Sequence, residues 1–361
     1  MSETLPPLGK TIACSAAHGD GGLGQHFAQI VENARAAGAL NGYYAPGIKT
    51  GDDDRGRIVA ERLSSWLFHY TPVRFDSGWK SHLGGDLFDR AVAGRLRAPL
   101  GEYIGFGGQA LRSFGRARRL GAARLGLVAA NSHVSNVARL HARAHRQYPL
   151  EGSWLNGAQV RKTLREYEMA DVIYVASEYT RQTFLAEGFP EEKLHRVHYE
   201  TRPRFQPPFA RPQDGVFRVV YTGSLSVMKG IPVLLDAFSR LEGAAELTLV
   251  GGWSSRGMRR YLQERLARDP RIQIAPGDPL PHLQRADVYV HPTYEDGWSY
   301  APVEALACGI PVIVTEDTGM KEQVREGING HVVPIGTWEA ILERLEHLRS
   351  APLAAGVSGK V

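Results

Sequence analysis

The sequence predicts an α/β protein that contains two doubly wound parallel-sheet domains in tandem. Along most of the 361 residues, apolar segments typical of buried strands alternate with helical segments of about ten to fifteen residues. A proline-rich segment without helical periodicity, residues 200–216, interrupts this alternation, which then starts again. We therefore expect a first domain over residues 1–199, a linker over residues 200–216 and a second domain over residues 217–361.

The first domain begins with an apolar strand that leads into an amphipathic helix. This helix, residues 26–38, carries apolar residues at helical spacing from Phe27 to Ala34. The stretch that follows, up to about residue 85, is predicted to be mainly helical. The predicted strands are residues 11–17, 101–108, 124–130, 171–178 and 193–200, and the further helices are residues 109–121, 161–170 and 179–188.

The second domain repeats the alternation and closes with an amphipathic helix. In that last helix Thr337 is the expected N-cap, and apolar side chains from Trp338 to Leu348 share one face. We expect it to pack back toward the first domain, and a ligand to bind in a cleft where the carboxyl ends of the two sheets face each other. The predicted strands are residues 216–223, 245–252, 271–277, 286–292 and 311–315, and the helices are residues 231–241, 258–267, 301–309 and 337–348.

Composition indicates a globular protein of the cytoplasm. The chain is 43% hydrophobic and 22% charged, and no apolar run approaches the roughly 18 residues of a membrane helix. Its first residues lack the pattern of a signal peptide. Cys14 and Cys308 lie far apart in apolar segments, so we expect both to be reduced.

Positive charge is concentrated in residues 90–146. This segment holds eleven arginines, no lysine and one acid, Glu102. Such a segment suggests an anionic partner, either phosphate groups or an acidic membrane surface, and the alternative is a solvated basic face. We therefore expect peripheral membrane association as one hypothesis. Nucleic acid is not expected, because the segment has no matching aromatic stacking face.

A glycine-rich loop follows the first strand. Gly21 and Gly22, with Gly19 and Gly24 beside them, would let the backbone approach a ligand closely, and the helix after them favours an anion. The spacing matches a dinucleotide fingerprint only loosely, and no ribose-binding acid follows about twenty residues later. The loop is therefore predicted to contact a phosphate or a sugar.

The segment "HPTYEDGWSYAPVEALACGIPVIVT" has a composition that suits a sugar nucleotide. Asp296 and Glu304 flank a bend at Gly297, so both carboxylates are expected at the mouth of the cleft with the loop amides. Carboxylates accept bonds from hydroxyl groups, and a helix N-terminus binds phosphate. Pro302 is expected in the first helical turn together with Glu304, where a carboxylate also stabilises the helix, so Glu304 alone does not prove a site.

Two further basic residues lie at the carboxyl ends of predicted strands. Lys229 opens a helix in the second domain and is predicted to neutralise a diphosphate leaving group. His133 follows a strand of the first domain and is a candidate for donor contact or proton transfer, although a lone histidine is usually structural. The three aspartates 52–54 are not preceded by a buried strand, and we interpret them as a solvated loop.

These segments together resemble the retaining GT-B glycosyltransferases of family four. The similarity covers nearly the whole chain: "GGLGQHFAQIVENARAAG" is similar to the family's glycine loop and first helix, "VAANSHVSN" to its histidine strand, and "VVYTGSLSVMKGIPVLLDAF" to its G-R-L-x-x-x-K-G segment. "ADVYVHPTYEDGWSYAPVEALACGIPVIVT" resembles the long E-G-F-G-x-P-x-x-E-A motif of the donor domain, which is the most specific of the four.

The resemblance implies transfer of a hexosyl group from a nucleoside-diphosphate sugar to an acceptor hydroxyl with retention of anomeric configuration. It implies no metal and no cofactor; the acceptor, whether small molecule, glycan or lipid-linked, stays open. The implied catalytic residues are His133, Lys229 and Asp296. The implied donor-binding residues are Gly21 and Gly22 at the phosphate or acceptor, Ser224, Lys229, Asp296 with the amides of Gly297, Trp298 and Ser299 at the sugar, Tyr300 and Ala301 at the diphosphate, and Glu304 at the ribose.

Three departures from the family pattern leave the donor open. Asp296 stands where the family has glutamate, and Ser224 stands where it has an arginine, for which Arg256 is a candidate replacement. The family's N-G-x-D at the linker is replaced by "HYETRPRF". The alternatives are a sugar-nucleotide 2-epimerase on the same fold and a catalytically silent GT-B scaffold, and the sequence does not identify the base, the sugar or the acceptor.

Overall fold

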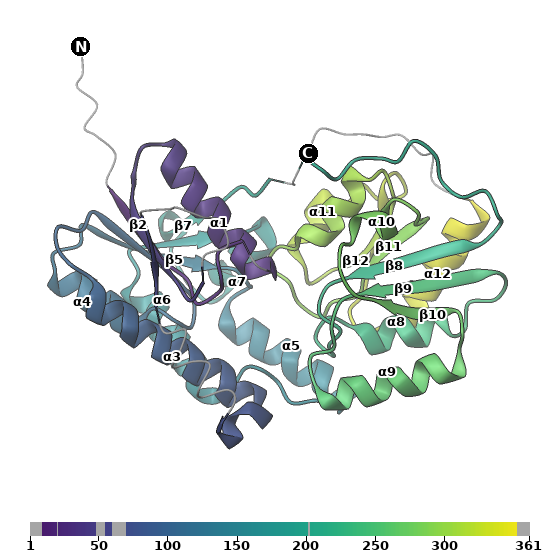
Figure 1. Ribbon diagram of the computed structural model, residues 1–361, viewed down its shortest axis with the longest axis horizontal. Helices are drawn as coiled ribbons and strands as arrows, with labels where there is room; N and C mark the ends of the chain where they lie inside the picture. Colours follow the sequence, from purple (N-terminus) through teal and green to yellow (C-terminus); the bar gives the residue numbers. More distant parts are fainter. Residues whose placement is uncertain (1–8, 20, 48–54, 60–69, 201–202, 352–361) are drawn as a thin grey trace, which may run out of the picture. The chain divides into compact units, whose positions relative to one another are not determined.

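The computed structural model describes residues 9–19, 21–47, 55–59, 70–200 and 203–351 (Figure 1). The predicted loop at residues 52–54 lies outside them. The chain divides into two compact units, one formed by Met1–Ala138 with Gly152–Tyr199 and the other by Arg139–Glu151 with Glu200–Val361. Each unit has one sheet, and all the strand pairs described in both sheets are parallel. The predicted fold class, two α/β domains with parallel sheets, is confirmed.

The sheet of the first unit has the strand order β3-β2-β1-β4-β5-β6-β7. Its central strands β4 and β5 are buried on both faces, as the alternation along β5 shows: Leu125 and Leu127 belong to one apolar cluster and Val128 to another. The first cluster also contains Phe88 of α3 and Phe114 of α4, and the second contains Phe27 of α1. The elements are β1 (Lys10–Ala13), α1 (Gly21–Ala36), β2 (Leu40–Ala45), β3 (Gly56–Ile58), η1 (Pro72–Phe75), α3 (Ser77–Arg95), β4 (Glu102–Phe106), α4 (Leu111–Arg119), β5 (Arg124–Ala129), α5 (Val134–Gln147), α6 (Gly157–Met169), β6 (Val172–Val175), α7 (Glu178–Ala186), η2 (Glu191–Lys193) and β7 (Leu194–Arg196).

Two predictions for the first unit are wrong. The stretch after the first helix was expected to be mainly helical, but it contains the strands β2 and β3, which extend the sheet beyond β1. Helix α1 begins at Gly21 rather than near residue 26, so Gly21, Gly22 and Gly24 lie in its first turns and not in a loop. Gly24 allows this early start, because a Cβ there would lie 2.3 Å from the carbonyl oxygen of Ala17.

The sheet of the second unit has the order β10-β9-β8-β11-β12-β13. One continuous apolar cluster includes Val219 of β8, Leu235 of α8, Met258 of α9 and Leu345 of α12. The buried face of α12 therefore packs in the core of the second unit itself. The elements are β8 (Phe217–Thr222), α8 (Ile231–Phe238), β9 (Ala245–Val250), α9 (Arg256–Arg268), β10 (Ile272–Ala275), α10 (Leu280–Leu283), β11 (Val288–His291), α11 (Tyr300–Ala307), β12 (Val312–Thr315), η3 (Gly319–Gln323), β13 (Gly330–Val333) and α12 (Trp338–Ser350).

The segment Arg139–Glu151, which the sequence places in the first domain, belongs to the second unit. The physical reason is apolar burial, since Leu140 and Ala144 are fully buried in the second unit's core cluster. Helix α5 is thus one continuous helix whose first turn belongs to one unit and whose remainder belongs to the other.

Candidate functional site

Two loops at the carboxyl edge of the second sheet meet and carry the principal charged residues. The loop after β8, residues 223–230, contains Lys229, and the loop after β11, residues 292–299, contains Asp296. The carbonyl oxygen of Met228 accepts hydrogen bonds from Tyr294 N (2.9 Å) and Thr293 Oγ1 (3.1 Å). The two loops are therefore held together by one backbone bond and one side-chain bond to the same carbonyl oxygen.

Lys229 and Asp296 form a direct ion pair. Lys229 Nζ lies 2.5 Å from Asp296 Oδ2; the lysine is partly exposed and the aspartate is buried. Gly230 makes this approach possible: its φ is +69°, and a Cβ there would lie 1.8 Å from the carbonyl oxygen of Pro292. The glycine after Lys229 is thus required for the close packing of the two loops.

His291 is a buried neighbour of the ion pair that the sequence did not single out. Its Nε2 lies 3.3 Å from Asp296 Oδ2, and its Nδ1 lies 3.4 Å from Tyr289 Oη. Burial lowers the pKa of His291, so the ring is neutral near pH 7. Burial alone would raise the pKa of Asp296, but the charge of Lys229 and the contact with His291 lower it to about 2. Asp296 is therefore an ionised carboxylate between a cation and a neutral imidazole.

Glu304 is buried in α11, but it does not lie in the first helical turn. Helix α11 starts at Tyr300, with Ser299 as its N-cap residue, so Glu304 is the fifth helical residue. The prediction that Glu304 shares the first turn and stabilises the helix N-terminus is therefore wrong. Burial raises the pKa of Cys308 and of Tyr289, and the charge of Glu304 adds to both shifts, as the second-largest cause for Cys308 and a smaller one for Tyr289. The carboxylate therefore lies near both residues.

The remaining predicted donor residues of this unit follow one another around the same loop. The chain bends at Gly297, Trp298 and Tyr300 are buried, and Ser299 and Ala301 are half-buried. The side chain of Ser299 makes no capping hydrogen bond to the first turn of α11. Ser224 lies in the loop after β8 and is exposed. The structure thus gathers these residues at one sheet edge, and their roles stay predictions.

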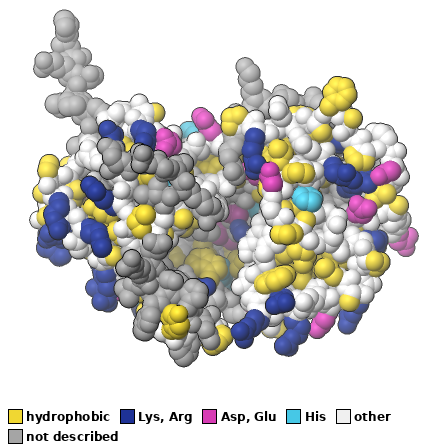
Figure 2. All heavy atoms as spheres, in the orientation of Figure 1, with side chains coloured by type: hydrophobic (Ala, Val, Ile, Leu, Met, Phe, Trp, Pro, Cys, Tyr) yellow, Lys and Arg dark blue, Asp and Glu magenta, His cyan; other side chains and the backbone are white. Residues whose placement is uncertain are grey.

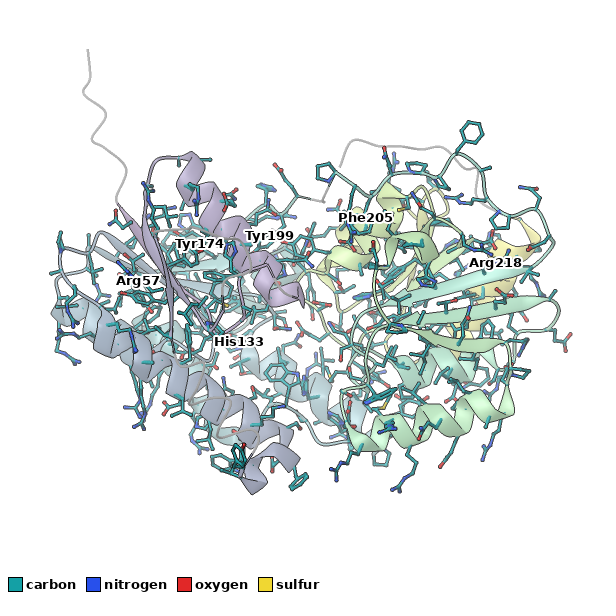
Figure 3. All side chains as sticks on the ribbon, in the orientation of Figure 1. Arg57, His133, Tyr174, Tyr199, Phe205 and Arg218 are labelled. Atoms are coloured by element: carbon teal, nitrogen blue, oxygen red, sulfur yellow. The ribbon has the colours of Figure 1, made fainter. Side chains whose placement is uncertain are left out.

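His133 lies in an aromatic environment of the first unit (Figure 3). Its side chain is 1% exposed, and its ring centroid lies 5.0–5.6 Å from those of Tyr167, Phe184 and Phe189. Nδ1 accepts a hydrogen bond from Ser135 N (3.3 Å), the second residue of α5, and burial lowers the pKa of the ring. This packing favours a structural role for His133 at the start of α5.

A different histidine, His141, lies near Lys229. It is 3% exposed, and three effects lower its pKa to about 3: burial first, then the neighbouring His145 and the charge of Lys229. His141 comes from α5 but belongs to the second unit. No local pattern in the sequence points to His141, because its surroundings depend on where the second half of α5 packs.

The glycines predicted to contact a phosphate or acceptor lie at the first turn of α1. Gly21 has φ +61°, and among the described residues nothing lies within 4 Å of a Cβ added at either Gly21 or Gly22. Both are exposed. Their contact with a phosphate or an acceptor stays a prediction.

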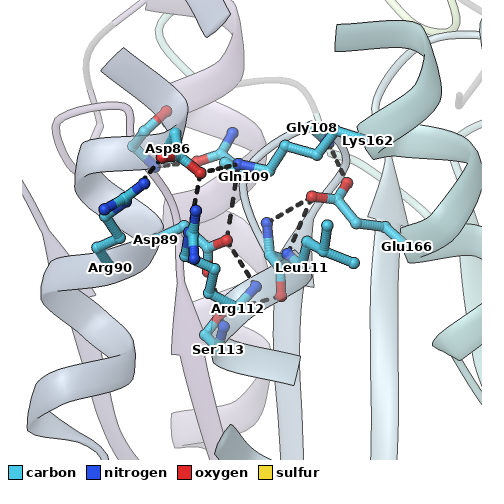
Figure 4. Close-up of polar contacts among 12 residues, drawn as sticks. Asp86, Asp89, Arg90, Gly108, Gln109, Leu111, Arg112, Ser113, Lys162 and Glu166 are labelled. Atoms are coloured by element: carbon cyan, nitrogen blue, oxygen red, sulfur yellow. Dashed lines mark hydrogen bonds and ion pairs between the residues drawn. The ribbon is translucent and has the colours of Figure 1, made fainter. Parts of the chain in front are cut away.

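Two buried carboxylates occupy the N-terminus of α4, a feature that the sequence did not reveal (Figure 4). Glu166 of α6 and Asp89 of α3 are both fully buried. Burial raises the pKa of Glu166 to about 7, while its bonds to backbone amides and the charge of Lys162 act in the opposite direction. The helix end is thus filled by the protein's own anions and does not offer a phosphate site. Glu166 accepts from Gly108 N, Ala110 N and Leu111 N, and Asp89 accepts from Arg112 N and Ser113 N.

Two arginines of the predicted basic segment, Arg95 and Arg97, form an exposed cluster in the first unit together with Arg57, which lies outside that segment. Arg57, Arg95 and Arg97 each lower the pKa of Tyr44, whose net shift is upward because of burial, so all three guanidinium groups lie near this tyrosine. Arg95 and Arg97 donate only to nearby carbonyl oxygens of residues 91, 94 and 96, and no ion pair is found for any of the three among the described residues. Figure 2 shows several basic side chains on the part of the surface where Figure 1 draws α4. Other arginines of the segment are paired, such as Arg124 with Glu102.

Two searches of the described ranges bear on metals and membranes. Within residues 9–351, apart from the gaps named above, no group of three or more His, Cys, Asp or Glu side chains is arranged to hold a metal ion. Among the helices that the structure describes, none is both long and apolar enough to span a bilayer.

The second unit is similar in sequence to known glycosyltransferases. The family model described as glycosyl transferases group 1 matches residues 216–350. The D-inositol 3-phosphate glycosyltransferase of Mycobacterium leprae is 28% identical over 159 residues, which are 41% of this chain and 37% of the relative. The capsular polysaccharide biosynthesis glycosyltransferase CapM of Staphylococcus aureus is 29% identical over 140 residues, 37% of this chain and 36% of the relative. The matches span little more than a third of these relatives' lengths.

Solved structures with the same fold cover almost the whole chain. Sucrose-phosphate synthase from Thermosynechococcus elongatus has a TM-score of 0.71 at 18% identity and covers 96% of this chain and 90% of that protein. Anabaena Alr3699/HepE in complex with UDP and glucose has a TM-score of 0.65 at 14% identity over 94% and 89%. WaaG, a glycosyltransferase involved in lipopolysaccharide biosynthesis, has a TM-score of 0.66 at 14% identity over 94% and 90%. Residues 216–350 are therefore similar to the glycosyl transferases group 1, in a chain whose two parallel-sheet units have the GT-B fold.

Proposed function

We propose that this protein is a glycosyltransferase that moves a hexosyl group from a nucleoside-diphosphate sugar to an acceptor hydroxyl with retention of anomeric configuration. The observation that carries the proposal is the Lys229–Asp296 ion pair at the carboxyl edge of the second sheet, inside the region that matches the family model. Ligands of open α/β sheets bind at this edge. The solved HepE complexes with UDP and UDP-glucose share the fold, which supports a nucleotide-sugar donor.

Lys229 and the start of α11 would bind the diphosphate. A lysine ammonium stabilises the negative charge that develops on a diphosphate leaving group. The amides of Tyr300 and Ala301 lie in the first turn of an eight-residue helix whose N-cap residue, Ser299, makes no side-chain capping hydrogen bond. These positive groups would do the work for which other transferases use a metal ion, so we propose that the reaction needs neither metal nor cofactor.

The carboxylates would hold the hydroxyl groups of the donor. Asp296, ionised at all ordinary pH values, would exchange part of its contact with Lys229 for a sugar hydroxyl, aided by the amides of Gly297, Trp298 and Ser299. Glu304, deeper in α11, would bind the ribose. Ser224 is exposed and offers a hydroxyl near the same loop. Gly21 and Gly22 would contact the phosphate or the acceptor, and His133 is assigned only to holding the start of α5.

The test is nucleotide-sugar binding and turnover with a panel of UDP, GDP and ADP sugars. We expect one donor to bind by calorimetry, and Lys229→Ala to lower kcat/KM by roughly 10²–10³ through loss of leaving-group stabilisation. The control is Arg268→Ala, which removes an exposed charge from α9 and should change nothing. Change of the donor without an acceptor would identify an epimerase, and absence of all binding and turnover would contradict the proposal.

We also propose that the arginine cluster around Tyr44 binds an anionic membrane surface that carries the acceptor. Among the described residues none of these three guanidinium groups has a carboxylate partner, and each one near an anionic lipid surface contributes about 1 kcal/mol of attraction. Vesicles of phosphatidylglycerol should float the protein and vesicles of phosphatidylcholine should not. The double variant Arg95→Glu with Arg97→Glu should weaken flotation at least about tenfold, and binding that ignores both salt and these substitutions would refute the idea.

A further inference from the structure

The segment Arg139–Glu151 is packed against the loops of the candidate site. Besides the burial of Leu140 and Ala144, Arg143 Nη2 donates to the carbonyl oxygen of Ile335 at 2.9 Å. Tyr148 Oη donates to Asp236 Oδ2 at 2.7 Å. Because these bonds hold the segment to the second unit at several points, its remaining polar side chains have defined positions relative to that unit's loops.

Glu151 joins the loop that carries Lys229 to the next loop of the sheet edge. Its Oε1 accepts a hydrogen bond from Val227 N at 2.7 Å, and its Oε2 accepts one from Ser254 Oγ. The carbonyl oxygen of Leu225 accepts from Ser254 N at 3.1 Å and also from Ser254 Oγ. The carboxylate thus fixes the backbone two residues before Lys229, through a charge-assisted bond of the stronger kind.

Gln147 holds the loop that carries Asp296. Its Oε1 accepts a hydrogen bond from Tyr294 Oη at 2.7 Å, and its Nε2 donates to the carbonyl oxygen of Gly336 at 2.8 Å. Gly336 has φ +70°, and a Cβ there would lie 2.6 Å from Gln147 Oε1, so the amide is closely enclosed. Tyr294 is fully buried and lies two residues before Asp296. The side chain of Gln147 therefore holds the loop two residues before Asp296, the second partner of the ion pair.

We propose that Glu151 and Gln147 are positioning residues for the Lys229–Asp296 pair, and this inference rests on the proposed function for its catalytic consequence. Each of them binds a backbone or side-chain group two positions before one member of the pair. Groups that act on a transition state must be held within about 0.5 Å of their working positions. Without these two bonds the loops would keep their contact through Met228 but lose their fixed distance to the core.

The first test measures the loops themselves by hydrogen exchange and mass spectrometry. Glu151→Ala should raise amide exchange in residues 223–230 at least about tenfold, and Gln147→Ala should do the same in residues 292–299. Arg146→Ala is the matched control and should change neither, because Arg146 lies beside Gln147 in α5 and makes no hydrogen bond or ion pair to either loop among the residues that the structure describes. Glu151→Gln keeps an oxygen for Val227 N and should restore most of the protection. Unchanged exchange in both loop peptides would overturn the proposal.

The second test separates positioning from a merely structural role. Binding of UDP, GDP and ADP is measured by calorimetry on the folded variants, with kcat and KM for the donor that the panel identifies. If Glu151 is a positioning residue, Glu151→Ala should raise both Kd and KM by roughly 5–50-fold while the folded fraction stays unchanged. Glu151→Gln should keep both constants within about threefold of the wild-type values. A lowered Tm with unchanged Kd would instead show a structural role and refute positioning. If the wild type binds no nucleotide, the proposed function fails, while the exchange data still decide whether the two residues hold the loops.

Discussion

Asp296 lies between a lysine ammonium and a buried imidazole, and this environment determines its charge. Burial disfavours a carboxylate, but Lys229 at 2.5 Å and His291 at 3.3 Å outweigh it. The family pattern has a glutamate at this position, and the shorter aspartate reaches Lys229 directly. In the proposed reaction a donor sugar must therefore share this carboxylate with the lysine, which makes Asp296 the residue most directly linked to sugar selectivity.

His141 should make the stability of the second unit depend on pH in the acid range. Its pKa falls from an ordinary 6.5 to about 3, because it is buried and because His145 and Lys229 lie near it. Between these two pH values the unfolded chain binds a proton at His141 and the folded chain does not. The stability that the folded protein gains from keeping His141 neutral is therefore fully present above pH 6.5 and is lost as the pH falls toward 3. The free energy of unfolding should drop by about 1–2 kcal/mol more for wild type than for His141→Gln between pH 7.5 and 5.0.

Urea unfolding at the two pH values measures this difference. The exposed His198, changed to Gln, is the control and should leave the pH dependence as it is in the wild type. An equal drop in wild type and His141→Gln would show that His141 titrates normally in the folded protein.

At the scale of elements, the close packing of the two site loops depends on one glycine, Gly230. Gly230→Ala combines a left-handed φ of +69° with a Cβ 1.8 Å from the carbonyl oxygen of Pro292, so the loops must separate. The substitution should lower the free energy of unfolding by more than about 3 kcal/mol, compared with roughly 1–2 kcal/mol for an unfavourable φ alone. Gly215→Ala supplies that comparison, because Gly215 has φ +76° and open space around it. Equal losses for the two variants, measured by thermal or urea unfolding, would contradict the proposed close packing.

The order of strands and helices was predictable wherever an apolar run and its helix had clear periodicity, as in β8, α8 and β11 of the second unit. The strand β2, "LNGYYA", was missed because its polar and glycine residues hide a period of two, although Tyr43 is fully buried. The start of α1 was missed because three glycines disfavour a helix unless tertiary packing requires it, as the contact of Gly24 with Ala17 does.

The two strand ends that carry the candidate site were predictable from the sequence, but the contacts that support them were not. Lys229 and Asp296 lie 67 residues apart in sequence and meet because β8 and β11 are neighbours in the sheet. His133 was favoured by its place after a strand, but only the structure shows the three aromatic rings around it. The roles of His291, Gln147 and Glu151 depend on tertiary packing, which no local pattern in the sequence encodes.

At the scale of the whole molecule, the two units carry different kinds of evidence. The family match lies in residues 216–350 of the second unit, where the proposed donor site also lies. The evidence for the first unit consists of its fold, the two carboxylates at the N-terminus of α4 and the arginine cluster. In the proposed function, the acceptor binds to this unit. Donor identity and acceptor identity are therefore separate questions for separate units.

The most direct test of the central claim is NMR spectroscopy of the reaction with a nucleotide sugar of known anomeric configuration. The donor that binds in the panel is incubated with the protein and an acceptor extract, and the anomeric proton coupling of the transferred sugar in the product is recorded. The account predicts a new glycosidic bond with the same configuration as the donor, formed without added metal and abolished by Lys229→Ala. A product of opposite configuration would contradict the retaining mechanism, and transfer that is unaffected by Lys229→Ala would contradict the site itself.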